Sequence, residues 1–283
     1  MSNVTKLAMK VERAGYTRIW FTEHHSGVDI SCAVPAMLIQ MVASATTQLR
    51  VGAGGVMLGN HSPIAVAEVY RALASLHPDR IDLGLGRASG AGLRLTSILR
   101  DGATVLNHTE FLASVRQIQN LTGERTDLPD IPVIVPVDAP APQSWVLTNS
   151  VDGARSAGTF GARIAFARNW APDAVEEALT AYREEIAKLD GRRARVILGV
   201  SVISAATSAE AQELSRNLGH DPEDAAVARC LFIGEHSLVA EQISDLYSRF
   251  EPEEVMVSSD VTDPGHRLEI FEALADHLLE MGT

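Results

Sequence analysis

The fold of this chain is decided by three segments, Thr17–His25 (TRIWFTEHH), Leu49–Pro63 (LRVGAGGVMLGNHSP) and Arg80–Gly90 (RIDLGLGRASG). Each segment begins with strand-like apolar residues and ends in glycine, histidine or other polar residues. They follow one another at a period of about thirty residues, which is typical of repeated βα units. Parallel α/β sheets and barrels bind ligands at the C-terminal ends of their strands. The stretch from Ile19 to Gly90 therefore predicts an α/β scaffold of the kind that enzymes use.

Apolar periodicity and Gly or Pro boundaries predict the remaining elements. Helices are expected at 4–14, 34–45, 63–76, 109–121 (capped by Thr109) and 267–279, and from starts near Asp152, Pro172, Ser208 and Ser237. Strands are expected at 17–21, 49–52, 80–85, 145–147, 164–167, 196–203 and 255–258. Residues 126–143 hold most of the prolines and predict a long loop with one extended piece, Ile131–Val137.

This alternation predicts a single α/β domain over residues 1–283 with a TIM (β/α)8-type barrel. The chain begins on a helix, and seven strands are one fewer than a closed barrel needs, so the N-terminal strand is expected to be missing or replaced. Unpaired backbone at an open edge invites aggregation. Either Ile131–Val137 or a second protomer is expected to cover that edge, or the native start lies upstream of Met1.

Composition narrows the classes of partner. The formal net charge of −12 disfavours nucleic acid and anionic membranes. Cys32 and Cys230 match no metal-ligand spacing and are expected to be buried free thiols. A secretory leader and an apolar run of membrane-spanning length are both lacking in the sequence, which favours a soluble cytoplasmic protein.

Two ligand motifs can be weighed from spacing alone. The segment GLGRASG at Gly84–Gly90 has its third glycine one position late for a dinucleotide fingerprint, so a Rossmann site is disfavoured. Its glycines still allow close approach of a ligand, and Arg87 could bind a phosphate. In Glu23-His24-His25, adjacent strand residues point to opposite faces, which disfavours a metal site. One histidine could act as an acid or base, or it could simply bond a loop carbonyl.

Two further positions each allow two interpretations. Gly54 and Gly55 interrupt a good strand pattern, which marks either a place where a ligand lies against the backbone or a packing kink. Ser150, between Asn149 and Gly153, opens a helix, where it could help to hold a phosphate or act only as an N-cap.

Taken together, the chain resembles the luciferase-like flavin-dependent oxidoreductases, a TIM-barrel family that includes bacterial luciferase and alkane-sulfonate monooxygenase. The resemblance runs over almost the whole chain, through RIWFTEHH, VGAGGVMLGNHSPIAVAE, LHPDRIDLGLGRASG, WVLTNS and VAEQISDLYSRFEPEEVMV. It implies FMN, received in reduced form from a separate reductase, and a monooxygenase reaction with O2 on a small organic substrate. It also implies a homodimer or a heterodimer with a related chain.

The resemblance assigns roles to individual residues. His24 matches the active-site histidine of the family. Gly54 and Gly55 match a bulge, often with a non-prolyl cis peptide, that supports the flavin ring. The FMN phosphate would be held by Arg87, Asn149, Ser150 and Gly153, and no metal is expected.

Two alternatives stay open. One is a flavin-free paralogue that acts as a noncatalytic subunit or a small-molecule binder. The other is a deazaflavin (F420)-dependent oxidoreductase of the same fold.

Overall fold

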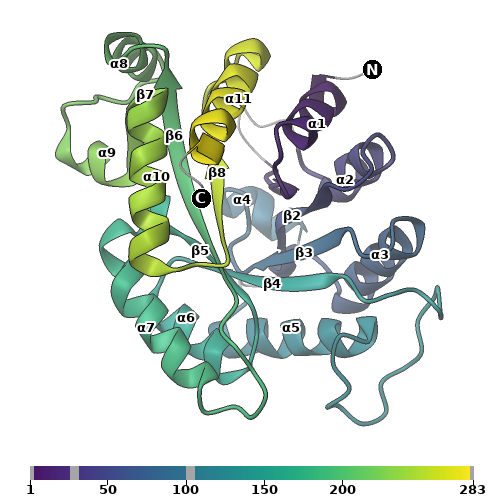
Figure 1. Ribbon diagram of the computed structural model, residues 1–283. Helices are drawn as coiled ribbons and strands as arrows, with labels where there is room; N and C mark the ends of the chain where they lie inside the picture. Colours follow the sequence, from purple (N-terminus) through teal and green to yellow (C-terminus); the bar gives the residue numbers. More distant parts are fainter. Residues whose placement is uncertain (1–2, 26–31, 100–105, 281–283) are drawn as a thin grey trace. The chain divides into compact units, whose positions relative to one another are not determined.

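The computed structural model describes residues 3–25, 32–99 and 106–280, and Figure 1 shows their helices and strands. Contacts divide the chain into two compact units, Met1–Glu12 with Thr17–Leu147 and Arg13–Tyr16 with Thr148–Thr283. The first described element is the predicted N-terminal helix, α1 (Asn3–Arg13). Gly15 follows it in a left-handed conformation, which is common after the end of a helix. No described helix combines the length and apolarity that crossing a bilayer requires.

The first unit is built on a parallel sheet. Its strands lie in the order β1 (Arg18–Phe21), β2 (Arg50–Met57), β3 (Ile81–Gly86) and β4 (Gln143–Thr148). The register pairs Gly52 with Asp82 and Gly84 with Trp145. The accompanying helices are α2 (Pro35–Ala43), the short 3-10 helix η1 (Leu58–Asn60), α3 (Pro63–Leu76), α4 (Leu93–Leu99) and α5 (His108–Thr122).

Helix α5 begins one residue earlier than predicted, and Thr109 is not its cap. Asn107 is the N-cap, because its side chain accepts from the Glu110 amide at 3.0 Å and Glu110 accepts from the Asn107 amide at 2.9 Å. This reciprocal pair is a capping box. The helix ends where Gly123 adopts a φ of 81°.

The loop after α5 is long, as predicted, but Ile131–Val137 forms no strand. The guanidinium of Arg71 on α3 fixes it instead, donating to the Pro136 carbonyl at 2.6 Å and to the Val137 carbonyl at 2.6 Å. Ile131–Val137 therefore does not cover a sheet edge by pairing as a strand, and the other two alternatives stay predictions. Two prolines remove ladder donors from it, which explains why a β-branched sequence does not pair.

The second unit is built around the long strand β6 (Val196–Ala205). Strand β5 (Ile164–Ala167) pairs in parallel with residues 196–199 of β6. Strand β8 (Glu254–Ser258) pairs with residues 197–201, and β7 (Leu231–Glu235) pairs with residues 201–205. The helices are α6 (Val151–Thr159), α7 (Val175–Ile186), α8 (Ser208–Asn217), α9 (Ala225–Cys230), α10 (His236–Phe250) and α11 (Pro264–Glu280), with 3-10 helices η2 (Arg168–Trp170) and η3 (Pro172–Ala174).

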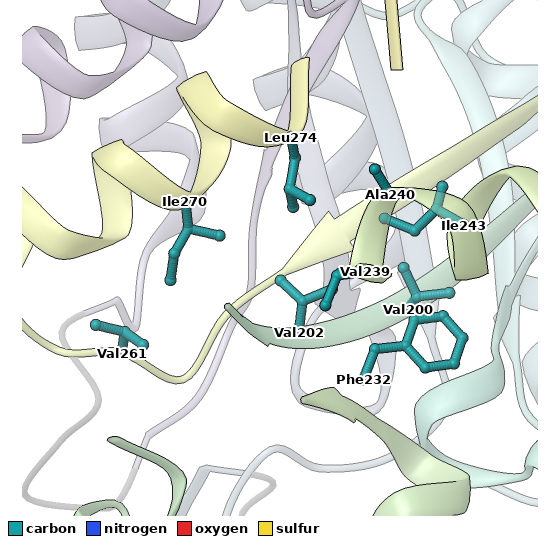
Figure 2. Close-up of a cluster of buried hydrophobic side chains, with 9 residues drawn as sticks. All are labelled: Val200, Val202, Phe232, Val239, Ala240, Ile243, Val261, Ile270 and Leu274. Atoms are coloured by element: carbon teal, nitrogen blue, oxygen red, sulfur yellow. The ribbon is translucent and has the colours of Figure 1, made fainter. Parts of the chain in front are cut away.

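A buried apolar cluster holds these elements together. Figure 2 shows its side chains converging from β6, β7, α10, α11 and the loop before α11; they are Val200, Val202, Phe232, Val239, Ala240, Ile243, Val261, Ile270 and Leu274. Burying such side chains is the main favourable term in folding. The cluster therefore holds β6 and β7 in place through Val200, Val202 and Phe232.

The seven predicted strands are present, and β7, α4 and α9 are additions that the apolar pattern did not reveal. With β7 the described strands number eight, so the predicted count of seven was one too few. The free cysteines also differ from expectation, since Cys32 and Cys230 are half-buried and not fully buried.

Candidate functional site

The first unit holds a buried carboxylate between two imidazoles. Glu23, just beyond β1, is 1% exposed. Its Oε1 lies 2.7 Å from His25 Nε2 and 2.8 Å from His61 Nε2, and its Oε2 accepts from the Met57 amide at 3.0 Å. Glu23, His25 and His61 are hereafter called the Glu23 cluster.

The cluster lies where the segments following three neighbouring strands meet. Asn60, after β2, donates from Nδ2 to the Ser89 carbonyl at 2.8 Å and makes a longer bond of 3.4 Å to Glu23. The His25 amide donates to the Gly90 carbonyl at 2.8 Å. The residues after β1, β2 and β3 are therefore tied into one hydrogen-bonded group at the C-terminal ends of the strands, where barrels of this type place their sites.

The electrostatics of the cluster favour an ionised carboxylate. Burial raises the pKa of Glu23, but the hydrogen bonds from His61 and His25, the charge of His61 and the Met57 amide together lower that pKa below its usual value. An ionised Glu23 accepts only, so both Nε2 atoms serve as donors. The cluster can therefore hold imidazole protons in fixed positions.

The predicted His24 lies beside this cluster but not in it. Its amide donates to the Cys32 carbonyl at 3.0 Å, and its side chain is half-buried. Glu23 and His25 meet because residues two apart in extended backbone point to the same side, which leaves His24 on the other side. Among the described residues, no group of three or more His, Cys, Asp and Glu side chains is placed to hold a metal ion.

Sequence reasoning missed His61 and Asn60. His61 lies far from Glu23 along the chain, and only the parallel alignment of β1 with β2 brings them together. The segment GNHSP does carry a polar signal immediately after a strand, which could have marked His61.

The Gly54–Gly55 peptide bond is cis, and the β2–β3 register shifts between Ala53 and Val56, so the predicted bulge is confirmed. A Cβ on Gly54 would lie 2.8 Å from the Trp20 ring, and one on Gly55 would lie 2.7 Å from the Gly84 carbonyl oxygen. Close packing therefore accounts for both glycines. Gly54 is also the one residue between Val51 and Met57 that is partly exposed.

An ionic layer lies near the opposite, N-terminal ends of these strands. Asp82 is fully buried and accepts from Arg18 at 2.7 Å, from Arg50 at 2.6 Å and from the Trp20 indole at 2.9 Å. The Arg18 guanidinium also lies 5.2 Å from the centre of the Trp145 ring. These bonds fix the indole of Trp20 against Gly54.

Arg87 directly follows β3 and is exposed, two residues before Ser89, which binds Asn60. His24, Gly54, Gly55 and Arg87 thus all belong to the first unit and follow or interrupt neighbouring strands.

The other predicted phosphate residues belong to the second unit. Ser150 is the N-cap of α6, since its Oγ accepts from the Gly153 amide at 3.2 Å, and the Ser150 amide donates to Thr148 Oγ1 at 3.3 Å. A Cβ on Gly153 would collide with that same Thr148 hydroxyl. N-capping by Ser150 is therefore confirmed, whereas phosphate binding by Asn149, Ser150 and Gly153 stays a prediction. The helix start favours an anion, although Asp152 in its first turn opposes one.

Comparison with known proteins identifies relatives of this chain. The family model described as luciferase-like monooxygenase matches residues 1–226. The uncharacterised protein YceB of Bacillus subtilis is 32% identical over 99% of this chain and 94% of its own length. A luciferase-like monooxygenase of Escherichia coli is 30% identical over 97% of this chain and 90% of its own length. An N-acetyl-S-alkylcysteine monooxygenase of B. subtilis is 31% identical over 75% of this chain and 64% of its own length.

Solved structures show the same fold. Apo-MsnO8 superposes with a TM-score of 0.84 at 30% identity, covering 98% of this chain and 92% of that one. The oxygenating constituent of 3,6-diketocamphane monooxygenase of Pseudomonas putida, solved with FMN, has a TM-score of 0.74 at 18% identity and covers 97% and 91%. The F420-dependent tetrahydromethanopterin reductase of Methanopyrus kandleri has a TM-score of 0.71 at 13% identity and covers 99% and 95%.

The predicted fold class is thus confirmed as that of the luciferase-like TIM-barrel proteins. With its family model, its full-length relatives and its parallel α/β architecture in agreement, the chain belongs to the luciferase-like monooxygenase family.

Proposed function

We propose that the chain is an FMN-dependent monooxygenase that acts on a small organic substrate with reduced flavin and O2. The family membership supports oxidoreductase chemistry, and one neighbour of the same fold is solved with FMN. In this proposal residues 1–283 form a single barrel domain, and a separate reductase supplies the reduced FMN. Bound reduced flavin would supply the electrons for O2 activation.

The observation that carries the proposal is the Gly54–Gly55 segment. Gly54 is partly exposed in a strand that is otherwise buried from Val51 to Met57, and it lies where the β2–β3 register shifts. A flat ring needs such a surface, because no side chain stands between it and the main chain. The residues present therefore fit an isoalloxazine ring.

The candidate ligands of the FMN phosphate are Arg87 in the first unit and Asn149, Ser150 and Gly153 in the second. The exposed guanidinium of Arg87 can form two parallel bonds to a phosphate. The start of α6 adds backbone amides and the Ser150 hydroxyl. The Ser150 hydroxyl can accept from the Gly153 amide and at the same time donate its own proton to the phosphate.

Protons would be handled by histidine. His24 is assigned as the acid or base that faces the reacting atoms. The Glu23 cluster is assigned a positioning role, since it binds the residues just after β1, β2 and β3 to one another.

A deazaflavin is the second candidate cofactor. The M. kandleri reductase and a secondary alcohol dehydrogenase of the same fold are F420-dependent. At 13% identity these structures support the shared fold and not a shared cofactor. Binding measurements distinguish FMN from F420.

Equilibrium dialysis of the purified chain against reduced FMN, oxidised FMN and F420 tests the proposal. We expect saturable binding of reduced FMN at micromolar concentration and weaker binding of F420. Tighter F420 binding would replace FMN by the deazaflavin. If none of the three binds saturably, the flavin-dependent assignment fails and the chain is a flavin-free paralogue.

We also propose a cytoplasmic location and a homodimer, or a heterodimer with a related chain. Exposed apolar side chains at α2 and α3 support packing against a second chain. They are Val34, just before α2, Met37 on α2, and Ile64, Val69 and Leu76 on α3.

A further inference from the structure

The indole of Trp20 crosses the sheet of the first unit from one strand to the next but one. Trp20 on β1 pairs with Gly52 on β2, and Gly52 pairs with Asp82 on β3. Paired residues of neighbouring strands point to the same face of a sheet, so the two side chains of this row share one face with only a glycine between them. The indole Nε1 accordingly reaches Asp82 and donates to its Oδ2 at 2.9 Å.

The indole is held at both of its ends. Asp82, which accepts from Nε1, is fully buried and also accepts from Arg18 at 2.7 Å and from Arg50 at 2.6 Å. At the other end, the three atoms nearest to a Cβ placed on Gly54 all belong to Trp20, and the closest is the ring atom Cε3 at 2.8 Å. The ring plane is therefore fixed between a buried carboxylate and the main chain of Gly54.

Trp20 lies on the same side of the sheet as the predicted acid or base. His24 follows Trp20 by four residues in extended backbone, so both side chains point to one face, and Gly54 directs its missing side chain to that face as well. Glu23 and His25 lie on the other face. The indole thus lies beside Gly54, one layer nearer to the N-terminal ends of the strands than His24.

Trp20 differs in its surroundings from the other tryptophans of the chain. Trp145 is fully buried and packs edge to face against Trp20, with ring centres 6.0 Å apart. Trp170 is 76% exposed and belongs to the second unit. Trp20 is half-buried, so part of it is open to a ligand although its orientation is fixed. Barrel interiors are filled by layers of side chains, and Trp20, Asp82 and Trp145 form such a layer beside Gly54.

We infer that the indole of Trp20 is the floor of the proposed flavin site and contacts the isoalloxazine ring, and that Asp82 is the positioning residue that holds this indole. The inference rests on the proposed function, because the ring it contacts is the one that function requires. Aromatic rings attract one another in offset or edge-to-face arrangements beyond the effect of the buried area. A fixed indole can supply such a contact without the entropic cost of being ordered when the ligand binds.

Nuclear magnetic resonance of the ¹⁵N-labelled chain tests the contact directly, because the three tryptophans give three indole N–H signals. Trp20→Phe, Trp145→Phe and Trp170→Phe assign these signals, since each variant loses one. We expect anaerobic addition of reduced FMN to shift the Trp20 signal, because a neighbouring aromatic ring changes the magnetic field at the indole. The Trp170 signal should stay unchanged and serves as the control within the same sample.

The affinity for reduced FMN, measured by anaerobic equilibrium dialysis, provides a second readout. Trp20→Leu should weaken binding about tenfold, as expected for the loss of one well-packed aromatic pair. Trp20→Phe keeps an aromatic ring at this position and should retain most of the affinity. Trp170→Leu is the matched control and should bind like the native chain, and thermal melts check that each variant is folded.

The two proposals can fail separately. Saturable binding of reduced FMN to the native chain with an unmoved Trp20 signal would overturn the contact and leave the proposed function standing, and this titration needs only an assigned spectrum of the native chain. A folded Trp20→Leu that binds reduced FMN with native affinity would overturn the contact as well. Absence of saturable flavin binding to the native chain would contradict the proposed function and, with it, the role of Trp20.

Discussion

At the scale of single residues, the candidate site depends mainly on buried charged groups and on glycines, which have no side chain. Glu23 keeps its charge in the interior because two imidazoles and the Met57 amide donate to it. Gly54 leaves room for the Trp20 ring that Asp82 holds in place. Each residue is fixed by partners on neighbouring strands, so each can be tested by a single substitution.

Replacing Glu23 with Gln should lower the free energy of unfolding by about 1–3 kcal/mol, because the amide cannot accept from all the donors that now surround the carboxylate. The pKa of Glu23 is lowered in the folded chain, so its contribution is complete above the ordinary glutamate pKa and is lost as the pH falls through the folded-state pKa. Urea unfolding of both proteins at neutral and acid pH measures this.

The difference between wild type and Glu23→Gln should therefore shrink in acid. Glu176→Gln, which changes an exposed carboxylate, is the control and should be near neutral. A difference that is constant across pH would argue against an ionised Glu23.

Replacing Gly54 with Ala should destabilise the chain by about 1–3 kcal/mol, because the new Cβ would lie 2.8 Å from the Trp20 ring. It should also weaken reduced FMN binding, because relief of the contact with Trp20 would shift the Gly54 backbone. Gly92→Ala is the matched control, since nothing lies within 4 Å of a Cβ there. Thermal melts of both variants measure their stability, and equilibrium dialysis measures their affinity for reduced FMN. Equal melting temperatures would show that Gly54 is not tightly packed.

At the scale of elements, apolar periodicity and the positions of glycine and proline predicted most of the helices and strands of the first unit. Helix α3 begins at the predicted Pro63, and β3 lies within one residue of its expected range. Strand β7 was missed because LFIG is short and directly follows α9, so no turn residue separates the two. The cap of α5 was misplaced because Asn107 and Thr109 are both good N-cap residues, and only the partner Glu110 distinguishes them.

This cap gives an element-scale prediction. Asn107→Ala should destabilise the chain by about 1 kcal/mol, since it leaves the Glu110 amide without its acceptor. Thr109→Ala should change the stability by less than about 0.5 kcal/mol, because surface substitutions away from caps cost little. Chemical denaturation of the two variants would contradict the capping box if Thr109→Ala proved the more costly.

At the scale of the whole molecule, the sequence predicted the family better than the site. The bulge at Gly54–Gly55 and the fold class come from local patterns, and both are confirmed. The Glu23 cluster depends on which residues of different strands meet, and spacing along one chain does not reveal such meetings. His61 was therefore absent from the predicted site although it contacts the buried carboxylate that follows β1.

The central claim is that the strand ends bind a phosphorylated isoalloxazine. The most direct measurement compares the affinity of the chain for reduced FMN with its affinity for reduced riboflavin, which lacks only the phosphate. The account predicts saturable binding of both, with FMN at least about tenfold tighter, and loss of that margin in Arg87→Gln. Equal affinities, or no saturable binding of either flavin, would contradict it.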